Sequence, residues 1–160
     1  MGYWDMPEAT AATIDADGHR IAYTHDIDGR RANARGFEVP RRTPESAAEL
    51  FWSQAAGFDL TFFEHYLADE AGHAQDLKAA EVALETFDAF ARAVLEHRPP
   101  DCQVLICSDH GNVEDLSTRG HTRNPVAVLS FGDGTLPAME TVRAKFRRTD
   151  PGRGGSRSVA

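Results

Sequence analysis

The apolar run QVLIC at residues 103–107 constrains the fold more than any other part of the chain. It follows a stretch, residues 77–97, in which apolar side chains recur every three or four positions, as in a long amphipathic helix. The segment RPP at 98–100 ends that helix. A short apolar run after such a helix is typical of a parallel strand buried on both faces. This order predicts an α/β protein.

The neighbouring segments predict the rest of the α/β order. RTPESAAELFWSQAAG predicts a helix with Thr43 as N-cap, Pro44 at the first helical position and Gly57 as its end. FDLTFFEHYLAD (58–69) predicts a strand that runs into a loop, and PVAVLSFG (125–132) predicts another strand. We therefore expect helices covering a largely parallel sheet, with ligands bound in loops beyond the carboxyl ends of its strands.

The chain divides into three parts along its sequence. Residues 1–42 are polar and turn-rich, and the segments DADG (15–18) and DIDG (26–29) predict tight turns beside one or two short strands. Residues 43–134 hold the predicted core. Residues 135–160 predict a short helix followed by a basic, disordered tail. A length of 160 residues suits a single domain with its own core.

Charge and composition exclude several classes of partner. Six basic side chains and one acidic one lie from Arg143 onward, so the rest of the chain is more acidic than the net charge of −8 suggests. An acidic body is a poor match for nucleic-acid phosphates. No segment approaches the ~20 apolar residues of a membrane span, and no signal peptide is recognisable. Cys102 and Cys107 are poorly placed for a disulfide. We expect a cytoplasmic protein that binds neither nucleic acid nor membrane.

Aspartate and histidine gather in two segments that follow predicted strands. Asp69 and His73 lie four positions apart after FFEHYL, and Asp109, His110 and His121 lie in SDHGNVEDLSTRGH after QVLIC. Two imidazoles and a carboxylate suit a divalent ion such as Mn, Zn or Fe. Each of these motifs can also be explained without a metal. Asp69 caps a helix that begins near His73, Asp-His-Gly-Asn forms a turn, and His121 is a loop histidine. Together, at the ends of successive strands, they predict a metal site.

The motifs DEAGH, SDHGNVED and GHTRNPV resemble the metalloenzyme domain of the alkaline phosphatase superfamily, in the branch of cofactor-independent phosphoglycerate mutase and phosphopentomutase. The resemblance runs from Thr43 to Gly132. It implies part of a three-layer α/β sandwich with a mostly parallel sheet. It also implies phosphoryl transfer on a phosphorylated small molecule, by a phosphatase (a hydrolase) or a mutase (an isomerase).

The same resemblance implies a role for each candidate ligand. Asp69, His73 and His121 would hold one ion, and Asp109 and His110 would contribute to a second, with Mn or Zn as the expected metals. Two such ions can clamp the attacking and leaving oxygens in phosphoryl transfer. Because imidazole binds metal in its neutral form, binding should weaken as the pH falls through the histidine range.

Four further residues of the same segment have two interpretations each. Arg119 and Arg123 lie close enough in sequence to the cluster to contact a phosphate oxygen, or they are solvent-exposed loop charges. Glu114 and Asp115 orient ligand histidines, or they form an exposed acidic turn. Sequence position alone leaves both alternatives open.

The resemblance also has gaps. The family begins with a strand that ends in a metal-binding aspartate and then presents a Ser or Thr nucleophile, and MGYWDMPEAT contains no such opening. We therefore expect a C-terminal portion of the family domain that supplies one complete ion site and half of a second, and that is inactive alone. Phosphoryl transfer would need the missing part, either from another, complementary chain or from an uninterrupted version of the gene. Exposed strand edges would favour pairing with such a chain or self-association.

Two other functions fit the same residues. The chain could be a non-catalytic metal-binding interaction module whose sheet edge pairs with a partner protein. It could also hold iron between Asp69, His73 and His121 for oxygen chemistry, in a site with two histidines and one carboxylate. The second alternative leaves the Asp-His-Gly-Asn motif without a role.

Overall fold

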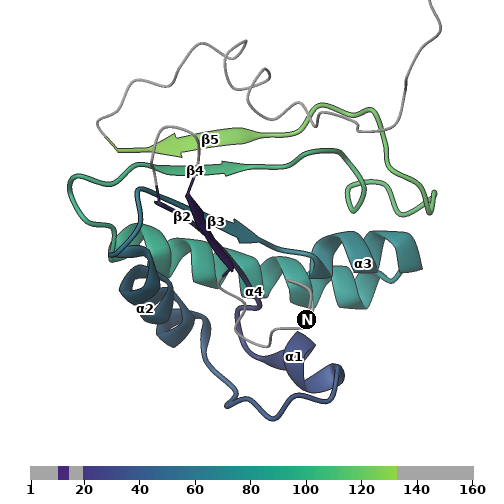
Figure 1. The fold of residues 1–160 in the computed structure, drawn as a ribbon. Helices are drawn as coiled ribbons and strands as arrows, with labels where there is room; N and C mark the ends of the chain where they lie inside the picture. The colour runs from purple at the N-terminus through teal and green to yellow at the C-terminus, as the bar shows by residue number, and fades with distance from the viewer. Residues whose placement is uncertain (1–10, 15–19, 133–160) are drawn as a thin grey trace, which may run out of the picture.

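The computed structural model describes residues 11–14 and 20–132, and Figure 1 shows their arrangement. The predicted turn at 15–18 and the predicted helix and tail at 135–160 lie outside the described residues. The elements are β1 (Ala11–Ile14), β2 (Arg20–His25), α1 (Arg30–Ala34), α2 (Pro44–Ala55), β3 (Leu60–Glu64), α3 (Leu67–Ala74), α4 (Leu77–Glu96), β4 (Val104–Cys107) and β5 (Val128–Phe131). This mixed order of helices and strands confirms an α/β protein.

The described strands form two small sheets. In the first, β2 lies between β1, with which it pairs antiparallel, and β3, with which it pairs parallel. In the second, β4 pairs antiparallel with β5. A mostly parallel sheet is therefore not found among the described strands. The reason lies in the loop between β4 and β5, where the Thr122 amide donates to the Gly111 carbonyl at 2.8 Å and turns the chain back on itself.

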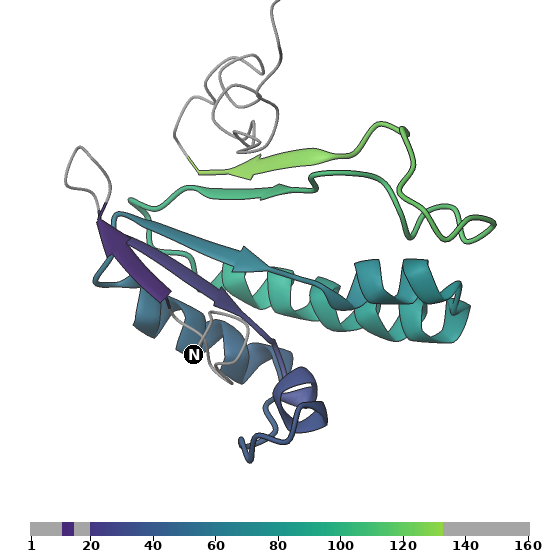
Figure 2. The same cartoon turned by 45° about the vertical axis from the view of Figure 1, so that its right-hand side comes forward.

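The run QVLIC is less buried than its sequence predicts. The side chains of β4 are half-buried, and Cys107 at its end is exposed. Val104 packs against the helical core, and Figure 2 shows the described helices on one side of the sheets. The prediction of a parallel strand buried on both faces is thus wrong for β4 in both direction and burial.

Helices α2 and α4 form as their sequences predict. Thr43 Oγ1 accepts a hydrogen bond from the Ser46 amide at 3.3 Å, and Asp76 Oδ1 accepts one from the Ala79 amide at 3.0 Å. Their apolar faces and one residue after β2 make the buried cluster, which consists of Ile27, Ala47, Ala48, Phe90, Ala93 and Val94. None of the described helices is both long enough and apolar enough to cross a membrane.

The segment after β3 is a helix where the sequence predicted a loop. Helix α3 contains both Asp69 and His73, so Asp69 does not cap a helix that begins near His73. The sequence LADEAGHA explains this outcome, because its alanines and leucine favour helix and its acidic pair lies in the first turn, where the helix dipole favours negative charge. The spacing of four then places Asp69 and His73 on the same face of α3.

The segment DIDG forms a tight bend between β2 and α1, as predicted. Asp26, at φ 73°, accepts hydrogen bonds from the amides of Gly29 and Ala32 at 3.0 and 2.8 Å. Asp28 is buried and pairs with the Arg41 guanidinium at 2.6 Å. These contacts hold α1 beside the core.

Candidate metal centre

Three side chains from two distant segments of the chain meet beyond the carboxyl ends of β3 and β4. Asp69 and His73 come from α3, and His121 comes from the loop after β4. His73 Nε2 lies 3.2 Å from His121 Nε2 and 3.4 Å from Asp69 Oδ2, and His121 Nε2 lies 3.6 Å from Asp69 Oδ1. One potential ligand atom from each residue lies within 4.8 Å of the other two. The three residues therefore form a compact set of nitrogen and oxygen donors.

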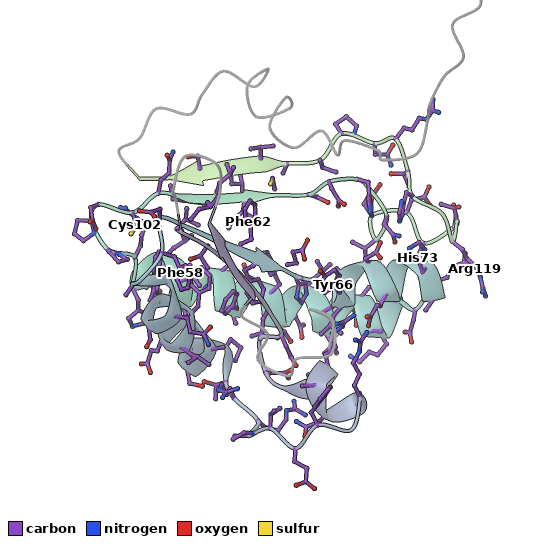
Figure 3. The ribbon with its side chains drawn as sticks, viewed as in Figure 1. Phe58, Phe62, Tyr66, His73, Cys102 and Arg119 are labelled. Carbon is purple, nitrogen blue, oxygen red and sulfur yellow. The ribbon has the colours of Figure 1, made fainter. Side chains whose placement is uncertain are left out.

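His73 is held with a lone pair toward this set. Its Nδ1 lies 2.6 Å from the Arg119 carbonyl oxygen, and Figure 3 labels both residues at the same end of the molecule. Because a carbonyl only accepts hydrogen bonds, Nδ1 carries the proton and Nε2 is left with a lone pair. A backbone carbonyl on the second ring nitrogen is a common partner of metal-binding histidines. The donor set thus fits a divalent cation.

The two members of the second predicted pair, Asp109 and His110, differ in exposure. The His110 ring stacks on His121 with centroids 3.5 Å apart and an angle of 15° between the planes. His110 Nδ1 is buried without a hydrogen-bond partner, which suits a further ligand position beside the cluster. The Asp109 side chain is 87% exposed and lies with its Oδ1 3.5 Å from His110 Nε2. The structure brings His110 to the cluster and leaves Asp109 at the surface.

Asn112 joins the two ligand-bearing segments, a role that the sequence analysis missed. This residue is buried, and its Nδ2 donates to Asp69 Oδ1 at 3.0 Å. Its amide lies against Gly72, where an added Cβ would overlap Asn112 Oδ1. The available signal was Gly72 itself, because glycine within a helix costs about 1 kcal/mol relative to alanine and needs a compensating reason.

Glu114 holds the loop between β4 and β5 in shape. Its carboxylate accepts hydrogen bonds from the Asn112 amide at 2.6 Å, from Thr122 Oγ1 and from Asn124 Nδ2 at 3.0 Å. The neighbouring Asp115 accepts from the Ser117 amide and hydroxyl. These carboxylates thus organise the loop that carries His121, rather than orienting a ligand histidine directly.

Acid should loosen this loop through Glu114. The hydrogen bond from Thr122 is the largest cause that lowers the pKa of Glu114 from 4.5 to about 2. Because the folded loop favours the carboxylate, its stabilising effect is complete above pH 4.5 and is lost as the pH falls toward about 2. We expect Glu114→Gln to reduce the hydrogen-exchange protection of the Asn112 amide at pH 5. The difference in Asn112 amide protection between the variant and the wild type should become smaller as the pH approaches 2.

Asp115→Asn is the matched control for this measurement. It neutralises a carboxylate one position along the chain whose partner is Ser117. The Asn112 amide should keep wild-type protection in this variant. Equal loss of protection in the two variants would contradict a specific role for Glu114.

The two arginines predicted near a phosphate lie on the same exposed loop. The Arg119 Nε donates to Gln75 Oε1 at 2.9 Å, so this guanidinium is attached to the end of α3. Arg123 is exposed two positions after His121. Both arginines are therefore close to His121 in the sequence, and the Arg119 guanidinium is hydrogen-bonded to Gln75.

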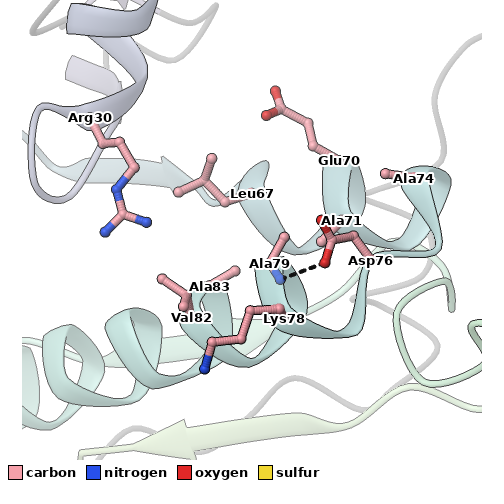
Figure 4. Close-up of a pocket in the computed structure, with 10 residues that line it drawn as sticks. All are labelled: Arg30, Leu67, Glu70, Ala71, Ala74, Asp76, Lys78, Ala79, Val82 and Ala83. Carbon is pink, nitrogen blue, oxygen red and sulfur yellow. Dashed lines mark hydrogen bonds between the residues drawn. The ribbon is translucent and has the colours of Figure 1, made fainter.

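A cavity of about 500 Å³ lies away from these ligands, between α3 and α4. Leu67, Ala71 and Val82 line it, and Figure 4 shows Arg30 and Lys78 around the same space. None of the five candidate ligands lines this cavity. The candidate metal centre thus lies beyond the carboxyl ends of β3 and β4, outside this cavity.

The part of the chain that carries the candidate ligands is similar to known proteins. The sequence pattern of the Metalloenzyme superfamily matches residues 44–152. The 2,3-bisphosphoglycerate-independent phosphoglycerate mutase of Cereibacter sphaeroides is 35% identical over 148 residues, which cover 88% of this chain and 26% of that protein. The phosphopentomutase of Methylobacterium nodulans is 41% identical over 68 residues, which cover 42% of this chain and 17% of that protein.

A second phosphopentomutase, from Symbiobacterium thermophilum, is 26% identical over 124 residues, which cover 77% of this chain and 28% of that protein. The chain therefore spans between 17% and 28% of the length of these three relatives. No solved structure matches the chain.

Proposed function

Because the chain belongs to the metalloenzyme superfamily, we propose that it is a phosphomutase-like segment in which Asp69, His73 and His121 bind one divalent metal ion. The observation that carries this proposal is the convergence of their ligand atoms within 4.8 Å. Two imidazoles and one carboxylate suit Mn or Zn. When bound, such an ion polarises a phosphoryl oxygen and lowers the pKa of coordinated water.

Hydrogen bonds with other residues of the chain fix the orientation of two of these ligands. The Arg119 carbonyl keeps the proton of His73 on Nδ1, and Asn112 Nδ2 restrains the Asp69 carboxylate. Outer hydrogen bonds of this kind fix the orientation of a ligand and raise its affinity for metal. Metal binding is therefore proposed as a property of the folded loop and α3 together.

We also propose that Asp109 and His110 contribute to a second ion, and that the substrate is a phosphorylated small molecule. The first is supported by the stacking of His110 on His121, which also gives the Asp-His-Gly-Asn motif a place that the iron alternative does not provide. The second is supported by relatives named as a phosphoglycerate mutase and a phosphopentomutase. Arg119 and Arg123 are the candidates for contacting the phosphate.

We propose that this segment does not transfer phosphoryl groups alone and needs further polypeptide for turnover. Three hydroxyls near the cluster in sequence are engaged elsewhere: Ser108 with the His110 carbonyl, Ser117 with Asp115, and Thr122 with Glu114. Each of these hydroxyls donates within its own loop, and those of Ser117 and Thr122 hold the loop in shape. Their structural roles support further polypeptide as the source of the nucleophile.

Calorimetric titration of Mn²⁺ into metal-free protein, with a phosphomonoester assay on the same samples, tests the proposal. We expect about one ion per chain and no hydrolysis. Two tightly bound ions with hydrolysis would contradict the proposed dependence on further polypeptide. Failure to bind Mn²⁺ or Zn²⁺ would refute the metal site.

A further inference from the structure

Gln75 ends α3 in a backbone conformation that glutamine seldom adopts. Its φ of 57° and ψ of 36° lie in the left-handed region. The amides of Gln75 and Asp76 donate to the carbonyls of Gly72 and Ala71, both at 3.0 Å, and so close the last turn of the helix. Glycine or asparagine is the usual residue at this position, because a longer side chain is strained there. A glutamine held in this backbone conformation indicates that its side chain has a role of its own.

Both ends of the Gln75 amide contact the loop after β4. Its Nε2 donates to the Leu116 carbonyl at 2.9 Å, and its Oε1 accepts from Arg119 Nε at 2.9 Å. These partners lie 41 and 44 positions further along the chain. The single side chain therefore ties both ends of the segment 116–119 to the end of α3.

This segment also carries the carbonyl that fixes His73. Arg119 is bound to Gln75 through its side chain, and its backbone oxygen lies 2.6 Å from His73 Nδ1. Helix α3 thus carries the candidate ligand His73. Gln75, which ends this helix, holds in place the Arg119 carbonyl that accepts the hydrogen bond from His73. Gln75, Arg119 and His73 form one closed set of contacts.

We propose that Gln75 is a positioning residue for the metal centre. By fixing the segment 116–119, its amide keeps the Arg119 carbonyl on His73 Nδ1 and so leaves the lone pair of Nε2 directed toward Asp69 and His121. Without this amide, the carbonyl is no longer held and His73 also adopts the form with its proton on Nε2, in which this nitrogen has no lone pair for the metal. The effect on metal affinity rests on the function proposed above, whereas the effect on the His73 tautomer does not.

Gln75→Gly is the variant that tests this role. It removes the amide and suits the left-handed backbone, so relief of backbone strain should offset part of the stability lost with the two hydrogen bonds. We expect its dissociation constant for Mn²⁺ to rise about 10-fold or more, as is typical when an outer partner of a ligand is lost. In metal-free protein at pH 8, ¹⁵N NMR should show His73 protonated on Nδ1 in the wild type and a mixture of tautomers in the variant.

Two further variants make the test decisive. Gln75→Asn tolerates the same backbone but is too short to span both partners, so it should behave like Gln75→Gly. Gln103→Ala is the matched control. Gln103, the residue before β4, donates from Nε2 to Ser130 Oγ in β5 at 2.9 Å, and loss of this contact should leave Mn²⁺ affinity unchanged.

Each outcome supports or overturns the proposal. An unchanged His73 tautomer in Gln75→Gly would overturn it, and so would an altered tautomer with unchanged Mn²⁺ affinity. An equal loss of affinity in Gln103→Ala would show that the effect is not specific to Gln75. If the wild type binds no Mn²⁺, the proposed function fails, but the tautomer of metal-free His73 still decides whether Gln75 positions this residue.

Discussion

Replacing His121 with alanine should weaken Mn²⁺ binding by more than about 100-fold, since even the loss of an outer partner of a metal ligand costs about 10–100-fold. His121 supplies one of three convergent ligand atoms, and its Nε2 lies 3.2 Å from His73 Nε2 and 3.6 Å from Asp69 Oδ1. Its side chain is 47% exposed, so the fold should survive the change. Calorimetric titration of metal-free protein with Mn²⁺ gives the affinity, and thermal unfolding of the same sample gives the stability.

His97→Ala is the matched control for this loss of imidazole. His97 ends α4, and its Nδ1 lies 2.9 Å from the Ala93 carbonyl oxygen, outside the cluster. Wild-type Mn²⁺ affinity is expected in this variant. Retention of wild-type affinity in His121→Ala would exclude this residue from the ligand set.

Gly72→Ala should both destabilise the protein and disable the candidate metal centre. The new Cβ would overlap Asn112, which is buried and hydrogen-bonded to Asp69. Overpacking of this kind costs about 1–3 kcal/mol, which exceeds or offsets the ~1 kcal/mol that alanine gains in a helix. The loop must move away from α3 and carry His121 with it. We expect a lower urea midpoint and at least about a 10-fold loss of Mn²⁺ affinity.

Two variants separate this clash from a general effect of glycine replacement. Gly120→Ala places a Cβ in the same loop, one position before His121, with only an ordinary contact of 3.7 Å to Thr118 Oγ1. It should retain most of the affinity and stability. Adding Asn112→Ala to Gly72→Ala removes the overlapped amide and should recover stability relative to Gly72→Ala alone. A double variant less stable than Gly72→Ala would contradict the steric explanation.

Local signals in the sequence predicted the parts of the fold that depend on local interactions. Thr43, Pro44 and the apolar spacing of residues 77–97 predicted α2 and α4, because caps and periodicity act within a few positions. The family resemblance is confirmed by the match over residues 44–152. The same local reasoning missed α3, because eight residues between a strand and a longer helix offer little periodicity to detect.

Long-range contacts account for the features that the sequence did not predict. The antiparallel pairing of β4 and β5 depends on a loop closed by Glu114 and Thr122. The contact of Asn112 with Asp69 spans 43 positions, and that of Gln75 with Arg119 spans 44. The convergence of Asp69, His73 and His121 was anticipated from the motifs, whereas the residues that hold them were not, because an isolated Asn or Gln gives no positional signal.

The packing of Trp52 provides the protein with an intrinsic optical probe. Its Nε1 donates to the Val94 carbonyl at 2.9 Å, near the C-terminal end of α4, whereas the ligand-bearing helix α3 precedes the other end. A helix of 20 residues is about 30 Å long. With Trp4 replaced by phenylalanine, indole fluorescence should therefore report on the core and stay insensitive to the ligand loop. The fluorescence of Trp52 would distinguish variants that lose only the metal centre from variants that unfold, without any attached dye.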